Sequence, residues 1–381
     1  MRTAYFDNNA TTRVLPSVQA AMIRVLEDGY GNPSALYQRG RQARQIVEDA
    51  RGAVAALLGC RPDEVIFTSG GTESDNAALF SACPAGSHLV VSAIEHDAVL
   101  NACLVLKRQG VQVSVVRPDG NGRLDPEEVG KALRPDTALV SVMTANNETG
   151  VIQPVEEIGR LVHDRGIAFH TDAVQAAGKI PVSVRSIGCD LLSLSAHKIH
   201  GPQGIGALYL RKGLSFRPLL VGGHQERGRR AGTENLPAIA GFGAAALAAG
   251  QGLEDGSITR LAAWRDAIER HLAQQVDGVA INGGSAPRVA NTSNLTIKGI
   301  PSTALLVALD RQGIALSAGS ACRAGSRRPS HVLTAMGLTA ADARAAIRIS
   351  LGKLNSQQDV DDLLEILPRS ILELRRNPSA A

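Results

Sequence analysis

Short apolar runs alternate with amphipathic stretches between about residues 65 and 210. Runs of strand length are expected to form strands at 65–68, 88–91, 111–116, 138–143, 167–170 and 190–194. Helical periodicity lies between them, as at 155–162. Strands that alternate with helices predict an α/β fold with a mostly parallel sheet covered by helices on both faces. In such a sheet, functional residues gather at the carboxyl ends of the strands.

The pattern changes after an Ala/Gly-rich segment at 241–252. A long amphipathic helix is expected at 258–276 and a strand at 294–297, and two helical stretches follow, the last at 359–375. We therefore expect a large domain over residues 13–255. Residues 1–12 and 256–381 together are expected to form a smaller α+β domain.

Composition narrows the class of protein. The chain has 381 residues, too many for one small core, with 44% hydrophobic and 20% charged residues, as is typical of a globular protein. The net charge is only +4 and the basic residues are dispersed, so no nucleic-acid partner is expected. Arg227, Arg229 and Arg230 alternate with glycine, which favours an anion-binding or interface loop.

Location is predicted from apolar runs and cysteines. No apolar run is long enough to span a membrane, and residues 1–10 lack the apolar core of a signal peptide. We therefore expect a cytoplasmic protein without a membrane partner. The cysteines are scattered and include no Cys-x-x-Cys pair, which favours free thiols: Cys60, Cys83, Cys103, Cys189 and Cys322.

Lys198 follows an apolar run and precedes a glycine-rich turn. A buried amine at such a place can form a Schiff base with a carbonyl cofactor. Asp172, at the end of another apolar run, could hold a pyridinium nitrogen, its usual partner in pyridoxal phosphate (PLP) sites. Two alternatives stay open from these residues alone. Lys198 could be a solvated surface residue, or His197 and His200 could bind a metal together with His170 or Asp172.

Three further segments follow predicted strands. Small residues at 68–76 close a strand and open a helix, where backbone N–H groups could bind a phosphate, or where Ser69 or Thr72 could simply cap the helix. His96 could stack on an aromatic ring or move protons, or be a surface histidine at a helix start. The asparagines at 146–150 could bind a ligand or form an ordinary turn.

Cys322 lies among Gly, Ser and Ala residues, in a predicted loop. Arg323, Arg327 and Arg328 are close in sequence and would favour the thiolate, which is the reactive form. The alternative is an incidental small residue in a loop. The other four cysteines lie in apolar or helical surroundings and are expected to be inert.

Taken together and in order, these segments resemble a known family nearly from end to end. It is the NifS/IscS family of cysteine desulfurases, within the class V aminotransferase superfamily of PLP-dependent enzymes of fold type I. Besides the surroundings of Asp172 and Lys198, the resemblance rests on residues 5–12, 31–34, 67–74, 95–96, 146–150, 231–235, 319–322 and 347–352.

The resemblance implies a role for each candidate residue. Lys198 resembles the Schiff-base lysine, Asp172 the partner of the pyridine nitrogen, and Gln175 the group that binds the ring oxygen. His96 resembles the imidazole stacked on the ring. The phosphate would be held by Gly71, Thr72, Ser195 and His197, and by Thr233 from a second subunit, which implies a homodimer. The substrate would be held by Asn32, Asn147 and Arg348. With His197 on the phosphate, no metal is expected.

The implied reaction converts L-cysteine to L-alanine. Lys198 would remove the Cα proton, His96 would assist, and the Cys322 thiolate would take the sulfur as a persulfide. The sulfur would then pass to an acceptor protein, such as an iron–sulfur scaffold. The sequence departs from many relatives at Leu36, Tyr37, Arg327 and Arg328 and at residues 376–381, which leaves the acceptor undetermined. Selenocysteine lyase or another β-elimination activity is one alternative, and a PLP-binding scaffold without turnover is another.

Overall fold

The computed structural model describes residues 3–318 and 329–377 of the 381-residue chain. Its larger sheet has seven strands, in the order β2-β8-β7-β6-β5-β3-β4. Strand β8 runs antiparallel to both of its neighbours, and the other neighbouring pairs are parallel. The mostly parallel α/β sheet predicted from the sequence is therefore confirmed. Its strands are β2 Val65–Thr68, β3 His88–Ser92, β4 Gln112–Val116, β5 Thr137–Ser141, β6 Ala168–Asp172, β7 Leu191–Ser195 and β8 Gly206–Leu210.

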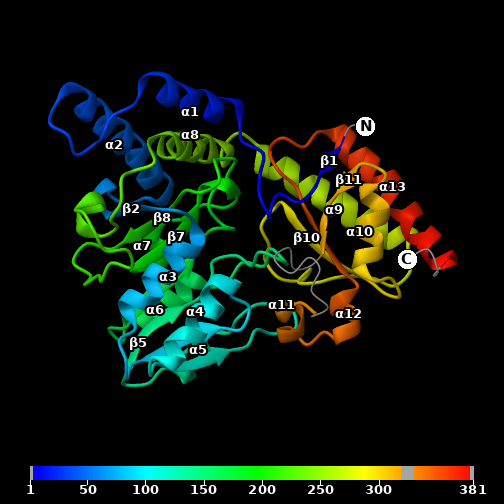
Figure 1. Cartoon of the computed structure of the whole chain (residues 1–381). Coiled ribbons are helices and arrows are strands. Elements are labelled where there is room, and N and C mark those ends of the chain that lie inside the picture. The colour runs from blue at the N-terminus through cyan, green and yellow to red at the C-terminus, as the bar shows by residue number, and fades with distance from the viewer. Residues whose placement is uncertain (1–2, 319–328, 378–381) are drawn as a thin grey trace.

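Helices cover both faces of this sheet (Figure 1). Successive side chains of a strand point to opposite faces, so Leu89 packs with the helices α3 and α4 while Val90 joins the core on the other face. The helix layer on the Leu89 face of the sheet contains α3 Gly71–Ala82 and α4 Asp97–Arg108. The helix layer on the Val90 face contains α1 Pro16–Asp28, α2 Gln38–Leu58, α5 Pro126–Ala132, α6 Val155–His163, α7 Val184–Ile187 and α8 Leu236–Gly252.

Helix α8 coincides with the Ala/Gly-rich segment, which the sequence pattern had not identified as a helix. Its small residues let it pack closely on α2, because a Cβ at Gly243 would lie only 2.7 Å from Ala50 Cα. Asn235 caps the helix by accepting a hydrogen bond from the Ala238 N–H at 3.2 Å. Within residues 3–318 and 329–377, no single helix is long and apolar enough to cross a membrane. Only α8 together with the next helix has the length and composition of a membrane span, and this pair is bent by 73°.

The rest of the chain surrounds a second, four-stranded antiparallel sheet in the order β12-β13-β10-β9. A separate apolar core joins this sheet to α9, α10 and α13 and includes Ala4 and Phe6 from the amino-terminal segment. The domain boundaries themselves stay a prediction. The elements are β9 Val279–Ile281, β10 Thr292–Ile297, β12 Ser317–Ala318, β13 Ala346–Ser350, α9 Ser257–Gln275, α10 Ser302–Asp310, α11 His331–Ala335, α12 Ala340–Arg344 and α13 Gln357–Arg376.

The amino-terminal segment crosses between the two parts of the molecule. Strand β1 Ala4–Tyr5 pairs in parallel with β11 Ile314–Ala315, and Figure 1 shows it beside α13. Residues 7–12 then run toward the larger sheet, where the Thr12 N–H donates to the His197 carbonyl at 2.9 Å. This path brings the first residues of the chain to the carboxyl ends of the parallel strands.

Candidate active site

A cavity of about 330 Å³ lies where the carboxyl ends of the large sheet meet β13. Asp172 and Ser195 are the last residues of β6 and β7, and His96 directly precedes α4. This is the edge at which ligands bind in open α/β sheets. The structure brings most of the predicted site residues together in its lining: Gly71, Thr72, His96, Asn147, Asp172, Gln175, Ser195, His197, Lys198 and Arg348.

Lys198 lies in a short 3-10 helix, Ala196–Lys198, directly after β7. Its Nζ donates hydrogen bonds to the carbonyls of Asn9 at 2.6 Å and Ala10 at 2.7 Å. The Lys198 amine therefore lies in the cavity, whereas the amine of a solvated surface lysine would point into water. Asn9 was not among the predicted residues, although it belongs to the 5–12 motif.

Asp172 is buried, and its Oδ1 accepts a hydrogen bond from the Val174 N–H at 2.8 Å. Burial raises the pKa of Asp172, and the neighbouring His96 and Lys198 oppose this effect. Asp75 also lines the cavity, and burial and the Asp172 charge raise the pKa of its carboxyl well above its ordinary value. A cation placed in the cavity against Asp172 would offset the cost of burying its charge. A protonated ring nitrogen is such a cation.

The start of α3 offers the anion site that the sequence suggested, but without the predicted cap. The N-cap residue is Gly70, with φ of 155° and no side-chain hydrogen bond, so the alternative in which Ser69 or Thr72 caps the helix is wrong. Only glycine is comfortable in this backbone conformation. The uncapped first turn leaves N–H groups for an anion beside Gly71 and Thr72.

Ser195 at the end of β7 and His197 in the 3-10 helix that follows also line the cavity, and a Cβ added at Gly71 would lie 3.7 Å from that of Ser195. The His197 Nδ1 lies 3.1 Å from the Thr11 hydroxyl, and burial together with the nearby Lys198 charge lowers the pKa of His197 to about 4. The imidazole is therefore neutral at pH 7 and would give a phosphate a hydrogen bond without a charge. Among the described residues, no group of three or more His, Cys, Asp or Glu side chains is placed to hold a metal.

The opposite wall carries Arg348 from the centre of β13, and its side chain is 1% exposed. Nη1 donates to the Asn147 carbonyl at 2.9 Å and Nη2 to Asp7 Oδ1 at 2.6 Å. Arg348 Nε and Asn147 Oδ1 are buried and have no hydrogen-bond partner within the described part of the chain. A buried donor and a buried acceptor that lack partners are costly unless a ligand satisfies them. They suit the polar groups of a small amino acid, whose carboxylate would pair with the guanidinium.

His96 stands at a helix start and also borders the cavity. Its Nδ1 accepts a hydrogen bond from the Ala98 N–H at 3.1 Å and so caps α4, while its ring lines the cavity. Two predicted residues lie elsewhere: Asn32 and Thr233 are exposed and outside the cavity lining. Asn32 Oδ1 accepts from the Ser34 N–H at 2.9 Å in a local turn. Cys322 lies outside the described residues.

The four described cysteines are poor nucleophiles. Burial is the largest effect at each, and it raises the pKa of Cys60, Cys83 and Cys103 to about 12 and that of Cys189 further. Because the thiolate is the reactive form, these side chains stay protonated and inert at neutral pH.

The residues present fit PLP. The uncapped helix start suits its phosphate, Asp172 its ring nitrogen and Lys198 its aldehyde. The floor of the cavity depends on the missing side chain of Gly71, because a Cβ there would lie 2.9 Å from Val174 Cγ2. Fold and site together define a PLP-dependent enzyme of fold type I.

Comparison with known proteins narrows the class. The aminotransferase class-V family matches residues 4–363. The cysteine desulfurase of Trichormus azollae is 47% identical over 378 residues, which cover 98% of this chain and 94% of that protein. A NifS-like protein of known structure is 39% identical with a TM-score of 0.90, over 98% of this chain and 100% of the other. The structure of SspA in complex with cysteine is 36% identical with a TM-score of 0.81, over 92% and 99%.

This chain therefore belongs to the cysteine desulfurases, within the class V aminotransferase family. Its cofactor is PLP, and the resemblance seen in the sequence is confirmed.

Proposed function

We propose that this enzyme takes the sulfur of L-cysteine, holds it as a persulfide on Cys322 and passes it to an acceptor protein. The observation that carries the proposal is the buried guanidinium of Arg348, whose Nε lacks a partner, in the same cavity as the Lys198 amine. This pairing fits an α-amino acid whose carboxylate is bound by Arg348 while its amino group lies toward Lys198, the residue that would hold the cofactor aldehyde.

The residues of the chain have separate tasks in this reaction. Arg348 and Asn147 orient the substrate carboxylate, which fixes the Cα–H bond for cleavage. Lys198 takes the Cα proton, and His96 moves a proton at the substrate. The bound cofactor supplies an electron sink for the pair released at Cα, and Asp172 maintains that capacity through the ring nitrogen.

The sulfur step balances without an added oxidant. The Cys322 thiolate attacks the substrate sulfur, the S–Cβ bond breaks, and its electron pair stays with the carbon skeleton, which is protonated and leaves as alanine. One cysteine and one protein thiol thus give one alanine and one persulfide.

The assay is alanine and persulfide formation from L-cysteine by the purified protein. Cys322→Ala should abolish persulfide formation and sulfur transfer, whereas Cys60→Ser should retain both, because the Cys60 pKa is raised to about 12. A Cys322→Ala enzyme that still releases sulfur at the wild-type rate would instead indicate β-elimination. The acceptor can be sought by trapping the persulfide form with candidate iron–sulfur scaffold proteins.

The proposed enzyme is a cytoplasmic homodimer. Large apolar side chains are exposed on α1, α8 and the segments beside α2, including Leu26 at 66%, Leu36 at 85%, Tyr37 at 62% and Leu247 at 57%. Exposed apolar groups in such number favour a protein partner, and a second copy would cover them. The exposed Thr233 is then available to the other subunit's phosphate site.

Mixing two inactive variants tests the shared site. Lys198→Ala and Thr233→Ala homodimers should each have low activity. Subunit exchange between them should restore activity, because one site of each hybrid dimer then combines Lys198 of one subunit with Thr233 of the other. A monomer in light scattering, or no recovery after proven exchange, would contradict the shared site.

A further inference from the structure

Lys179 is a second lysine beside the active site, in the turn that follows Gln175. Its residue exposure is only 8%, which is rare for lysine without a specific partner. It was not singled out from the sequence, although it interrupts an apolar stretch at 176–182. Nothing in the proposed reaction uses it.

The amine of Lys179 has two acceptors. It donates to Gln175 Oε1 at 2.5 Å and to Asn9 Oδ1 at 3.1 Å. Burial and the charges of Lys198 and Arg348 lower the pKa of Lys179 well below its ordinary value. These two oxygens accept two of the N–H donors of Lys179.

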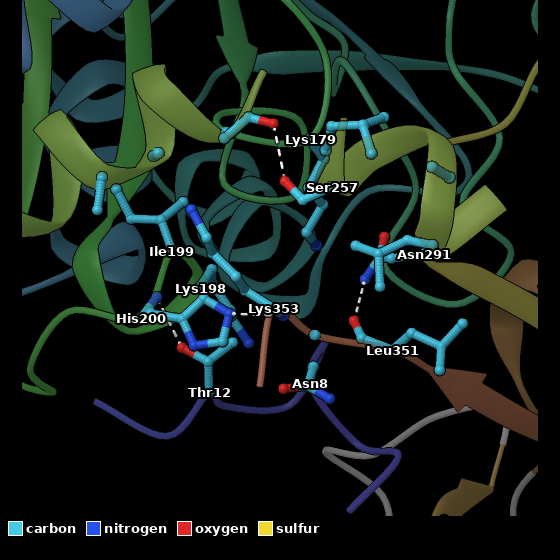
Figure 2. A pocket seen from close by; sticks show the side chains of 18 of the residues that line it. Asn8, Thr12, Lys179, Lys198, Ile199, His200, Ser257, Asn291, Leu351 and Lys353 are labelled. Carbon is cyan, nitrogen blue, oxygen red and sulfur yellow. Dashed lines mark hydrogen bonds between the residues drawn. The ribbon is translucent and has the colours of Figure 1, made fainter. Parts of the chain in front are cut away.

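Lys179 does not reach the main cavity. It lines a separate small cavity of about 60 Å³, together with Lys198, His200 and Lys353 (Figure 2). Gln175 lines the main cavity and not the small one. Lys179 can therefore affect a ligand in the main cavity through the residues it contacts or through its charge, which acts on Lys198.

The contact fixes which way the Gln175 amide faces. Its oxygen is taken by Lys179, and its nitrogen donates to the Asn9 carbonyl at 2.9 Å. A flipped amide would place N–H groups against the N–H groups of Lys179 and an oxygen against the Asn9 carbonyl. In the observed orientation the second N–H of the amide stays available as a donor, and Gln175 lines the main cavity.

We propose that Lys179 is a positioning residue, which holds the Gln175 amide so that an N–H and not a carbonyl oxygen faces the ring oxygen of the cofactor. The inference rests on the role of Gln175 in the proposed function. Asn9 is held on its other side by Thr292 Oγ1 at 2.9 Å and Asn291 Nδ2 at 3.1 Å, so its carbonyl is a fixed acceptor for the amide.

The test is a double-mutant cycle with the holoenzyme, read from the visible absorbance of bound PLP as a function of pH. Lys179→Met keeps the aliphatic stem but removes the donor to Oε1, so the observed orientation of the Gln175 amide loses one of its two hydrogen bonds and is held less firmly. The ring oxygen then loses a donor and becomes more basic, and the titration midpoint should move to higher pH. Affinity of the apoenzyme for added PLP should fall by about tenfold, the effect of one hydrogen bond to a charged group.

Gln175→Ala supplies the second arm of the cycle. It should shift the midpoint in the same direction, and Lys179→Met should add nothing in that background, since it acts through the amide. Lys353→Met is the matched control: it removes a lysine from the same small cavity without touching Gln175, and should leave the midpoint unchanged.

The outcomes separate the two ideas. A shift with Gln175→Ala but none with Lys179→Met overturns the role of Lys179 alone. A Lys179→Met shift that persists in the Gln175→Ala background means an effect that does not pass through Gln175, such as one through Asn9 or through the charge near Lys198, and also overturns it. No shift with Gln175→Ala overturns the assignment of Gln175 to the ring oxygen, on which the inference rests.

Discussion

Arg348 and Asp7 form an ion pair of 2.6 Å between residues that are 341 positions apart in sequence. Arg348 comes from the centre of the antiparallel sheet, where it is opposite Asn294 on β10. Asp7 follows β1 and forms a bridge with Ser350, two residues along β13 from Arg348. The amino-terminal segment thus holds the guanidinium in place before any substrate enters.

Replacing Asp7 by asparagine should destabilise the protein. Arg348 is 1% exposed and Asp7 21%, so the variant leaves a buried guanidinium charge with no carboxylate partner in the described structure. We expect the free energy of unfolding to fall by about 2 kcal/mol, which is less than the loss seen when an ion pair with two fully buried partners is broken. Thermal unfolding of the purified protein measures it. Glu128→Gln, which breaks the exposed pair with Lys131, is the control and should change stability little.

Arg348→Lys should raise the KM for cysteine by tenfold or more. Lysine keeps the positive charge, but it lacks the planar fork that binds a carboxylate through two parallel N–H groups. The shorter reach also breaks the contact with the Asn147 carbonyl. Initial rates of alanine release give KM, and the cofactor absorbance shows that PLP is still bound. An unchanged KM would mean that the substrate carboxylate is held elsewhere.

Glu226 anchors the loop that leads to Thr233. Its carboxylate accepts two hydrogen bonds from Arg51 at 2.7 and 2.8 Å and one from the Phe67 N–H at 2.9 Å. These contacts hold Glu226 and Arg227 in the left-handed region, with φ of 46° and 59°. Such a backbone persists only where its surroundings fix it.

Glu226→Gln should therefore lower the free energy of unfolding by about 3 kcal/mol, because it leaves the buried Arg51 without its main counter-ion. Glu48→Gln is a matched control. It removes the other carboxylate near Arg51. The Glu48 side chain is 43% exposed and accepts one hydrogen bond from Arg51 Nε at 3.2 Å. Chemical unfolding of both variants compares them, and equal losses would show that burial of the Glu226 pair does not matter.

The sequence predicted the parts of the fold that depend on local pattern. The parallel strands read as apolar runs because both of their faces are buried, as Leu89 and Val90 show. Strand β8 and helix α8 were not predicted. β8 starts at Gly206, beside a turn, and α8 has the glycines of a loop because α2 packs against it. Both depend on tertiary contacts that no local window contains.

The candidate site divides in the same way. Asp172 and Lys198 were predicted because residues at the carboxyl ends of parallel strands must meet at one edge, and Ser195 was predicted from the family resemblance. Asn9 and Lys179 were missed, because their importance comes from hydrogen bonds across more than 160 residues, such as that between Gln175 and Asn9. Only the path of the amino-terminal segment brings these groups together.

Glu95→Gln should make the protein more stable at pH 8 than the wild type. Burial of Glu95, with a smaller effect of the Asp172 charge, raises its pKa to about 8, whereas an unfolded glutamate titrates near 4.3. The folded state therefore keeps an extra proton between these values, and the wild type loses stability as pH rises, by up to about 1.4 kcal/mol per pH unit. In the wild type, the Met143 N–H donates to Glu95 Oε1 at 2.8 Å. The glutamine oxygen can accept the same hydrogen bond, and the glutamine side chain has no charge to bury. Thermal unfolding at pH 5.5 and pH 8 should show an advantage that grows with pH, and a constant difference would contradict the raised pKa.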